Sequence, residues 1–309
     1  MRQHRRQQLL RRESCPGCSA TSHGVLYDCP FDRPPISDYL LSFYGGRCDP
    51  ARLSPWHYTL AECDACSLVF QQHVPDAELL RTLYGEWILR EESHDKAVAR
   101  GLHQRRTYAF QIMSLIEYFR VDPSEVEVLD YGMGWGIWLQ MAAALGCTVS
   151  GVEFSDERRD RATEQAVEVL DETDLPESRF HFINTEQVFE HLTAPLETAA
   201  RLRRALRPGG ILRISVPNGS DIKDRLARGD WDAPKGSPDS LNAVAPLEHL
   251  NCFDHRSLVT MTTTAGLREA RIPLRQRLSQ WQPVRSVASA LVHAVRRPRG
   301  TVLLLESTP

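Results

Sequence analysis

Apolar positions in the second half of the chain alternate between two periods. Short apolar runs, typical of strands buried on both faces, recur between stretches with three- and four-residue spacing, typical of helices. The predicted strands are 126–130, 147–154, 179–184, 211–218, 268–273 and 301–307. The predicted helices are 136–145, 155–170, 195–207, 255–267 and 283–295, with Pro208 and Gly209 beyond the end of the third. This alternation predicts an α/β fold with right-handed crossovers and a mostly parallel sheet covered on both faces.

The N-terminal part of the chain has a different pattern. Residues from about 13 to 75 are rich in Pro, Gly, Cys and aromatic residues without a sustained helical period, which predicts a small loop-rich module. Helices are predicted from about Pro75 to Tyr84 and from about His94 to Phe119. We therefore expect four parts: a disordered basic start at 1–12, a cysteine module at 13–75, connecting helices at 76–122 and an α/β domain at 123–309.

Composition narrows the possible partners. The chain has 309 residues, 42% of them hydrophobic and 25% charged, with a formal net charge of -3. This balance does not favour nucleic acid or a membrane surface as a partner, and no apolar run approaches the roughly 18 residues that a membrane span needs. The start, MRQHRRQQLLRRES, has no apolar core of a secretory signal. We expect a cytoplasmic protein and make no prediction of its oligomeric state.

Three glycines follow the predicted strand that ends in Asp130. They are Gly132, Gly134 and Gly136. A dinucleotide-binding turn has the spacing G-x-G-x-x-G, and here Ile137 stands where its last glycine would be. No Lys-Ser/Thr pair follows, so the loop is not a P-loop. The spacing still favours a tight turn with close backbone approach to a ligand and a helix N-terminus aimed at it.

An acidic residue, Glu153, ends the next predicted strand, where a carboxylate can accept the hydroxyls of a ribose. At this point the chain resembles the class I S-adenosylmethionine (SAM) dependent methyltransferases, whose motif is a strand ending in acidic-x-Gly-x-Gly-x-Gly with a further acidic residue after the next strand. Three later segments resemble the ubiquinone-biosynthesis type of these enzymes: FHFINTEQVFEHLTAP, ALRPGGILRISVPN and PLEHLNCFDHRSLVTMTTTAGL. The resemblance implies a doubly wound, mostly parallel seven-stranded sheet and SAM as the cofactor.

The resemblance also implies roles for individual residues. Asp130 would meet the cationic amino group of the methionine part, and Glu153 would take the ribose hydroxyls. Gly132, Gly134 and Gly136 would let the backbone approach the carboxylate and ribose. The adenine would lie near 171–175, without an assigned residue.

Two features depart from the family pattern and bear on cofactor affinity. His181 stands where the family usually has aspartate, and Tyr131 and Trp135 are bulkier than the usual residues of the glycine loop.

Four cysteines form two Cys-x-x-Cys pairs, Cys15 with Cys18 and Cys63 with Cys66. Each pair can offer two thiolates to one tetrahedral zinc, and four thiolates leave no open position for catalysis. The prediction is a structural zinc in a zinc-ribbon-like module. The alternative is four ordinary reduced cysteines.

The inserted loop of this module carries Cys29 and Cys48 as spare candidate ligands. The segment CDACSLVFQQHVPDAELLRTLY resembles the zinc-binding segment that precedes some sugar C-methyltransferases. The glycine that often follows each cysteine pair there is replaced here by Ser19 and Ser67.

Methyl transfer from a sulfonium is an in-line displacement, and a base is needed only for a hydroxyl or carbon-acid acceptor. The candidates are His191, which follows the fourth strand, and His249 with Glu248 in the segment that resembles the family's lid. A structural role for each histidine is the alternative.

The sequence therefore predicts a SAM-dependent methyltransferase that acts on a small-molecule acceptor. O-, C- or N-methylation in the biosynthesis of a sugar, a quinone or another secondary metabolite all fit. One alternative is a non-catalytic protein of the same fold that uses the cysteine module for interaction. The other is a nicotinamide-dependent oxidoreductase, against which the glycine spacing argues.

Overall fold

A computed structural model describes residues 9–88, 101–273 and 300–308. The predicted helix at 283–295 and the start of the helix predicted at 94–119 lie outside these residues. The chain forms two compact units, which are described separately. Unit 1 consists of Met1–Ser93, Glu190–Pro195 and Pro217–Met261. Unit 2 consists of His94–Phe189, Leu196–Val216 and Thr262–Pro309.

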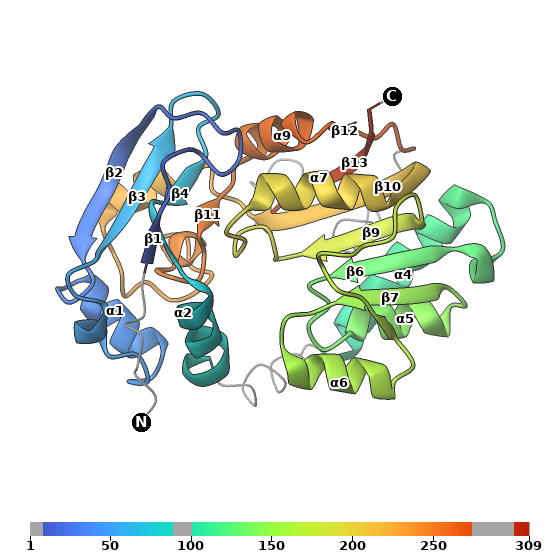
Figure 1. The fold of residues 1–309 in the computed structure, drawn as a ribbon, viewed down its shortest axis with the longest axis horizontal. Helices are drawn as coiled ribbons and strands as arrows, with labels where there is room; N and C mark the ends of the chain where they lie inside the picture. Colours follow the sequence, from blue (N-terminus) through green and yellow to red (C-terminus); the bar gives the residue numbers. More distant parts are fainter. Residues whose placement is uncertain (1–8, 89–100, 274–299, 309) are drawn as a thin grey trace. The chain divides into compact units, whose positions relative to one another are not determined.

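Unit 2 is built on a seven-stranded sheet with the order β12-β13-β10-β9-β6-β7-β8 (Figure 1). Its strands are β6 (Glu127–Tyr131), β7 (Thr148–Val152), β8 (Glu168–Val169), β9 (Phe180–Glu186), β10 (Leu206–Pro217), β12 (Leu267–Glu269) and β13 (Gly300–Ser307). The neighbouring pairs from β10 to β8 are parallel, and β12 is antiparallel to β13. The predicted α/β fold with a mostly parallel seven-stranded sheet is confirmed.

Helices connect the parallel strands of unit 2. They are α5 (Ile137–Ala144), α6 (Asp156–Glu164) and α7 (Pro195–Ala205), while α4 (Gly101–Phe119) precedes β6 and α9 (His255–Thr264) precedes β12. The chain winds outward in both directions, from β6 through β7 to β8 and from β9 to β10. Right-handed crossovers therefore place α5 and α6 on one face and α7 on the other, which makes the sheet doubly wound.

The helix predicted at 155–170 is too long. It ends at Glu164, and Glu168–Val169 form β8 beside β7. Ala166 takes a positive φ of 59°, and Val167 is buried in the core of unit 2. The chain leaves the helix because this turn lets Val167 pack and lets β8 pair with β7. The helix predicted at 195–207 ends slightly early, at Ala205, because β10 begins at Leu206.

Unit 1 contains a four-stranded sheet with the order β11-β4-β3-β2, in which every pair is antiparallel. Its strands are β2 (His23–Pro30), β3 (His57–Cys63), β4 (Val69–Gln71) and β11 (Asn251–Cys252). The loop-rich prediction missed these strands; in β2 the apolar residues Val25 and Leu26 are exposed, so its sequence lacks the alternation of a half-buried strand. A second pair joins β1 (Leu9–Arg11) to β5 (His73–Pro75), so the expected disordered start gives way to a strand at Leu9.

The helices of unit 1 are α1 (Ile36–Phe43), α2 (Ala77–Thr82), which continues into a π-helical turn at Leu83–Trp87, and α8 (Ile222–Arg228). Short 3₁₀ turns lie at Pro50–Leu53 and Asn242–Val244 in this unit and at Pro123–Glu125 in unit 2. None of the helices within the described ranges combines the length and apolar character that a membrane crossing requires.

An aromatic cluster ties the 217–261 segment to the N-terminal residues of unit 1. The ring of Trp231 lies 5.4 Å from Tyr27, 5.6 Å from Tyr39 and 5.7 Å from Tyr58. Aromatic pairs at this spacing contribute beyond their buried area. Residues 217–261 therefore pack with the cysteine module although the sequence analysis assigned them to 123–309. The four-part division itself stays a prediction.

Candidate functional site

The glycine loop connects β6 to α5 in unit 2. Gly132, Gly134 and Gly136 have φ values of 79°, 56° and 69°, a backbone conformation that residues with a side chain rarely adopt. A Cβ on Gly132 would lie 2.6 Å from Val188, whereas one on Gly134 or Gly136 would meet no atom within 4 Å. The last two glycines therefore border open space, where a ligand can approach the backbone.

The carboxylate of Glu153 holds this loop against the end of β7. Its Oε2 accepts the N–H of Gly134 at 2.8 Å. Its Oε1 accepts the N–H groups of Phe154 and Ser155 at 3.0 Å each. The side chain is buried, so its orientation is set by these bonds. Glu153 and the glycines are thus together at one edge of the sheet, as the sequence predicted.

Asp130 belongs to a polar row that crosses the centre of the sheet. The register aligns Asp130 with Asn184 on β9, and Asn184 with Arg213 on β10. Asn184 donates from Nδ2 to Oδ1 of Asp130 at 2.8 Å, and Arg213 donates to Oδ1 of Asn184 at 2.9 Å. All three are buried. Burial raises the pKa of Asp130 to about 7. The cost of charging a buried carboxyl therefore outweighs the hydrogen bond from Asn184 and the charge of Arg213, which both lower this pKa.

Asn184 and Arg213 were missed from the sequence. The one available signal was an arginine inside the apolar run ILRISV, because a charged residue within a buried strand needs a partner. Which partner it meets depends on the register between β9 and β10.

His181 lies at the amino end of β9, the opposite edge from the glycine loop. Its Nδ1 accepts the N–H of Glu127 at 3.2 Å, and its Nε2 pairs with Arg207 at 2.6 Å. Its ring packs edge-on against Phe119. This departure from the family pattern is therefore a packing feature, away from the sheet edge that carries Asp130.

The two bulky loop residues have partners within unit 2. The hydroxyl of Tyr131 donates to Glu172 at 2.7 Å, which links the end of β6 to the segment after β8. The ring of Trp135 lies beneath the guanidinium groups of Arg158 and Arg161, at 5.2 and 5.4 Å. Both side chains brace the loop.

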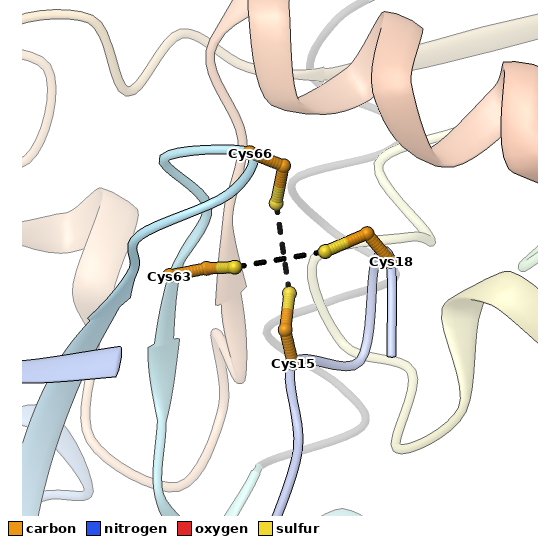
Figure 2. Close-up of side chains that lie close together, drawn as sticks. All are labelled: Cys15, Cys18, Cys63 and Cys66. Carbon is orange, nitrogen blue, oxygen red and sulfur yellow. Dashed lines mark hydrogen bonds between the residues drawn. The ribbon is translucent and has the colours of Figure 1, made fainter. Parts of the chain in front are cut away.

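Four thiols of unit 1 converge on one point (Figure 2). Cys15 and Cys18 lie between β1 and β2, Cys63 ends β3, and Cys66 lies in the turn before β4. The sulfurs of Cys15 and Cys66 are 3.6 Å apart, as are those of Cys18 and Cys63, and all four lie within 4.8 Å of one another. Tetrahedral zinc with Zn–S bonds of about 2.3 Å separates its sulfurs by about 3.8 Å. The cluster fits that ion.

Charge also favours a cation at this cluster. A hydrogen bond with Cys66 lowers the pKa of Cys15 to about 5 and raises the pKa of Cys66. Burial raises the pKa of Cys18 to about 11. One negative charge is therefore stable here, and further deprotonation needs a positive ion.

The spare cysteines do not join the cluster. Cys29 and Cys48 are buried in the apolar core of unit 1. Among the residues that the structure describes, the cysteine cluster consists of the four predicted ligands.

The two cysteine turns have the same backbone geometry. The N–H of Ser19 donates to the carbonyl of Cys15, and that of Ser67 to the carbonyl of Cys63, each at 2.9 Å. Both serines have a φ of 64°. The left-handed conformation explains why glycine is usual at these positions.

Glu190, His191 and His249 form a second cluster in unit 1, with ligand atoms within 4.8 Å of one another. Nδ1 of His191 lies 2.9 Å from the carbonyl oxygen of Glu248. Because a carbonyl only accepts, that nitrogen carries the proton and Nε2 has the lone pair. The rings of His191 and His249 are 4.8 Å apart at 80°. Burial lowers the pKa of both imidazoles, which keeps them neutral and able to accept a proton.

Arg12 joins the two segments that carry these histidines, a role that the sequence did not indicate. Its guanidinium donates to the carbonyl oxygens of Gln71, Leu192, Thr193 and Leu250 and to Oδ1 of Asn251. Leu192 follows His191, and Leu250 follows His249. Burial lowers the pKa of Arg12 to about 9. Arg12 therefore fixes the backbone beside both histidines.

A family model described as a methyltransferase domain matches residues 102–270, more than half of the chain. Two similar curated proteins are both named ubiquinone biosynthesis O-methyltransferase. The one from Actinobacillus pleuropneumoniae serotype 5b (strain L20) is 25% identical over 158 residues, which cover 43% of this chain and 65% of that protein. The one from Histophilus somni (strain 2336) is 27% identical over 163 residues, covering 44% and 66%. The chain thus spans slightly less than two thirds of these relatives.

A solved structure of the plantazolicin methyltransferase BpumL in complex with SAH has the same fold. It is 14% identical, has a TM-score of 0.50 and is matched over 75% of this chain and 94% of that chain. At this identity the likeness concerns the fold alone.

Replacing Ser19 or Ser67 with glycine should stabilise unit 1 by up to about 1 kcal/mol each, because the left-handed conformation strains a residue with a Cβ. The greater flexibility of glycine in the unfolded chain offsets part of this gain. Chemical unfolding at a fixed zinc concentration measures the difference.

Ser37→Gly is the matched control for this measurement. Ser37 lies in α1, where glycine costs about 1 kcal/mol. If Ser19→Gly and Ser67→Gly destabilise the protein as Ser37→Gly does, the two serines are not strained.

Proposed function

We propose that this chain transfers a methyl group from SAM to a small-molecule acceptor. The premise is that the chain belongs to the methyltransferase-domain family, whose model matches residues 102–270. One observation carries the proposal: the glycine loop borders open space at Gly134 and Gly136, directly beside the buried carboxylate of Glu153. A nucleoside with an ammonium tail matches such a loop, because its glycines let a ligand approach the backbone closely and two acidic residues lie at its sides. The names of the curated relatives support a small acceptor.

In this proposal each residue of the loop region binds one part of SAM. Asp130 meets the ammonium, and the glycine loop takes the carboxylate and ribose. Glu153 accepts the ribose hydroxyls. A carboxylate has about four acceptor positions, and three backbone N–H groups already use Glu153. The remaining acceptor position, on Oε2, is the one for a ribose hydroxyl.

SAM supplies the electrophilic methyl group, and the chain supplies alignment and the removal of water. For a hydroxyl or carbon-acid acceptor, we propose that His249, with His191 as the second candidate, takes the proton. Burial keeps both imidazoles neutral, and the carbonyl of Glu248 fixes the tautomer of His191. The buried carboxylate of Glu190, 3.9 Å from Nε2 of His191, can balance the positive charge that results.

We also propose that Cys15, Cys18, Cys63 and Cys66 bind one structural zinc. The sulfur spacing and the thiol pKa values support this set. With four thiolates the coordination shell is closed, so the ion would stabilise unit 1 and take no part in methyl transfer.

The proposed activity is tested by incubating the protein with methyl-labelled SAM and a small-molecule metabolite extract. We expect a labelled small molecule together with S-adenosylhomocysteine (SAH), both absent with Asp130→Asn. If SAM is left unconsumed by several extracts, or if the label enters macromolecules only, the proposal is wrong.

Glu153→Ala should weaken SAH binding about tenfold or more. Hydrogen bonds to a charged group are worth about 1.5–3 kcal/mol, and the substitution also releases the Gly134 N–H. Isothermal calorimetry measures the affinity. The matched control is Glu168→Ala on β8, whose carboxylate pairs with Arg179. Equal affinity of Glu153→Ala and the unaltered protein would remove this residue from the site.

Protein purified without chelator should contain one zinc per chain, and Cys63→Ser/Cys66→Ser should contain none. Removing two of four ligands leaves too few thiolates for a stable site. Elemental analysis gives the ratio. Cys29→Ala/Cys48→Ala, which alters only core cysteines, should keep its zinc. Zinc retained in the first double variant, or absent from the unaltered protein, would contradict the ligand set.

His249→Asn should lower turnover by about 10²–10⁴-fold at saturating SAM, with SAH affinity nearly unchanged, once an acceptor of the hydroxyl or carbon-acid type is known. Because burial lowers its pKa, turnover should fall only when the pH drops below the usual value of 6.5. His191→Asn tests the second candidate.

His57→Asn, which alters a histidine paired with Asp28 at the surface, is the control for both variants. If His249→Asn and His191→Asn both keep more than about a third of normal turnover, well short of the range expected for a general base, neither histidine is the base.

A further inference from the structure

The polar row beneath the glycine loop has a fixed direction. Nδ2 of Asn184 donates to Asp130 at 2.8 Å, and Oδ1 of Asn184 accepts from Arg213 at 2.9 Å. An arginine only donates, so it always selects the oxygen end of the amide. Arg213 therefore turns the amino end of Asn184 toward Asp130. With the amide reversed, two oxygens would face each other at Asp130.

We propose that Arg213 and Asn184 are positioning residues for the cofactor, because they hold the Asp130 carboxyl ionised and aligned for the ammonium group of SAM. The inference deepens the proposed function and rests on it. Asn184 occupies Oδ1 of Asp130, which leaves Oδ2 as the oxygen for the ammonium. Arg213 never touches the cofactor in this arrangement and acts through the amide.

The charges around Asp130 make this cation necessary. Glu186 on β9 and Glu153 after β7 both disfavour its ionisation, and Arg213 on β10 favours it. Tyr108 on α4 is the other titratable group that interacts with Asp130, and burial keeps its phenol neutral by raising its pKa. Arg213 is therefore the one cation among the described groups that act on Asp130 at this point.

Arg213 is costly to bury, and its partners offset that cost. Arg213 is 4% exposed, and its guanidinium contacts Oε2 of Glu186 at 3.4 Å besides Asn184. A buried ion pair is weak evidence for stability alone, since apolar residues of similar volume often stabilise a core as well or better. If the Arg213 charge serves to keep Asp130 ionised, its presence within the apolar run of β10 is explained.

The test is the pH dependence of SAH binding to the unaltered chain, Arg213→Met and Arg213→Lys, measured by calorimetry. The pKa of Asp130 is about 7, and loss of the nearby Arg213 charge should raise it by about one unit. Arg213→Met should therefore bind SAH about tenfold more weakly at pH 6. At pH 9 Asp130 is ionised in both proteins, and the difference should fall below about twofold. Arg213→Lys keeps the charge and should stay close to the unaltered protein.

The ratio of variant to unaltered affinity is the readout, because the ammonium of SAH itself also titrates at alkaline pH, equally in every sample. Arg207→Met is the control, since Arg207 lies on the same strand beside His181 at the far edge. It should bind SAH normally at both pH values. If Arg213→Met does not fold, Asn184→Ser interrupts the row instead and should show the same loss at pH 6.

Three results separate the possibilities. A loss in Arg213→Met that is equal at pH 6 and pH 9 means general damage and overturns the inference. Unchanged binding at pH 6 overturns it as well. If the unaltered chain does not bind SAH at all, the proposed function fails together with the inference.

Discussion

The carboxylate of Glu153 provides the contacts on which the glycine loop depends. Through Gly134 it reaches the loop after β6, and through Phe154 and Ser155 it fixes the chain at the end of β7. Parallel pairing brings these two strand ends to one edge, so a single buried side chain can bridge them. This bridge and the positive φ angles fix the loop conformation in which Gly134 and Gly136 border open space.

The two units are stabilised by different kinds of contact. Unit 2 is a layered α/β fold whose core is made of consecutive apolar runs, crossed by one polar row of Asp130, Asn184 and Arg213. Unit 1 gathers segments from three parts of the chain and holds them with an aromatic cluster, four converging thiols and the guanidinium of Arg12. These contacts add to an apolar core that includes residues of the N-terminal and 217–261 segments. The family match spans both units, so the segment at 217–261 belongs to the methyltransferase domain by sequence although it packs in unit 1.

Features that depend on neighbouring residues could be predicted from the sequence. The strand, turn and helix around Gly132 are local, and Cys15 and Cys63 stand in repeated short motifs. Features that depend on register or on distant segments could not. The bond from Arg213 to Asn184 requires the register of β10 on β9, and β11 pairs with β4 across most of the chain. The roles of Glu153, Asp130 and the histidines in binding and catalysis stay predictions.

The central claim is that unit 2 binds a SAM-type nucleoside rather than a dinucleotide. Thermal unfolding of the unaltered protein with SAH, and separately with NAD, tests it most directly, because a ligand that binds only the native state stabilises it. At about a hundred times its dissociation constant, SAH should add roughly 2.7 kcal/mol to the unfolding free energy and raise the melting temperature. NAD at the same concentration should leave the melting temperature unchanged. Stabilisation by NAD and none by SAH would contradict the account.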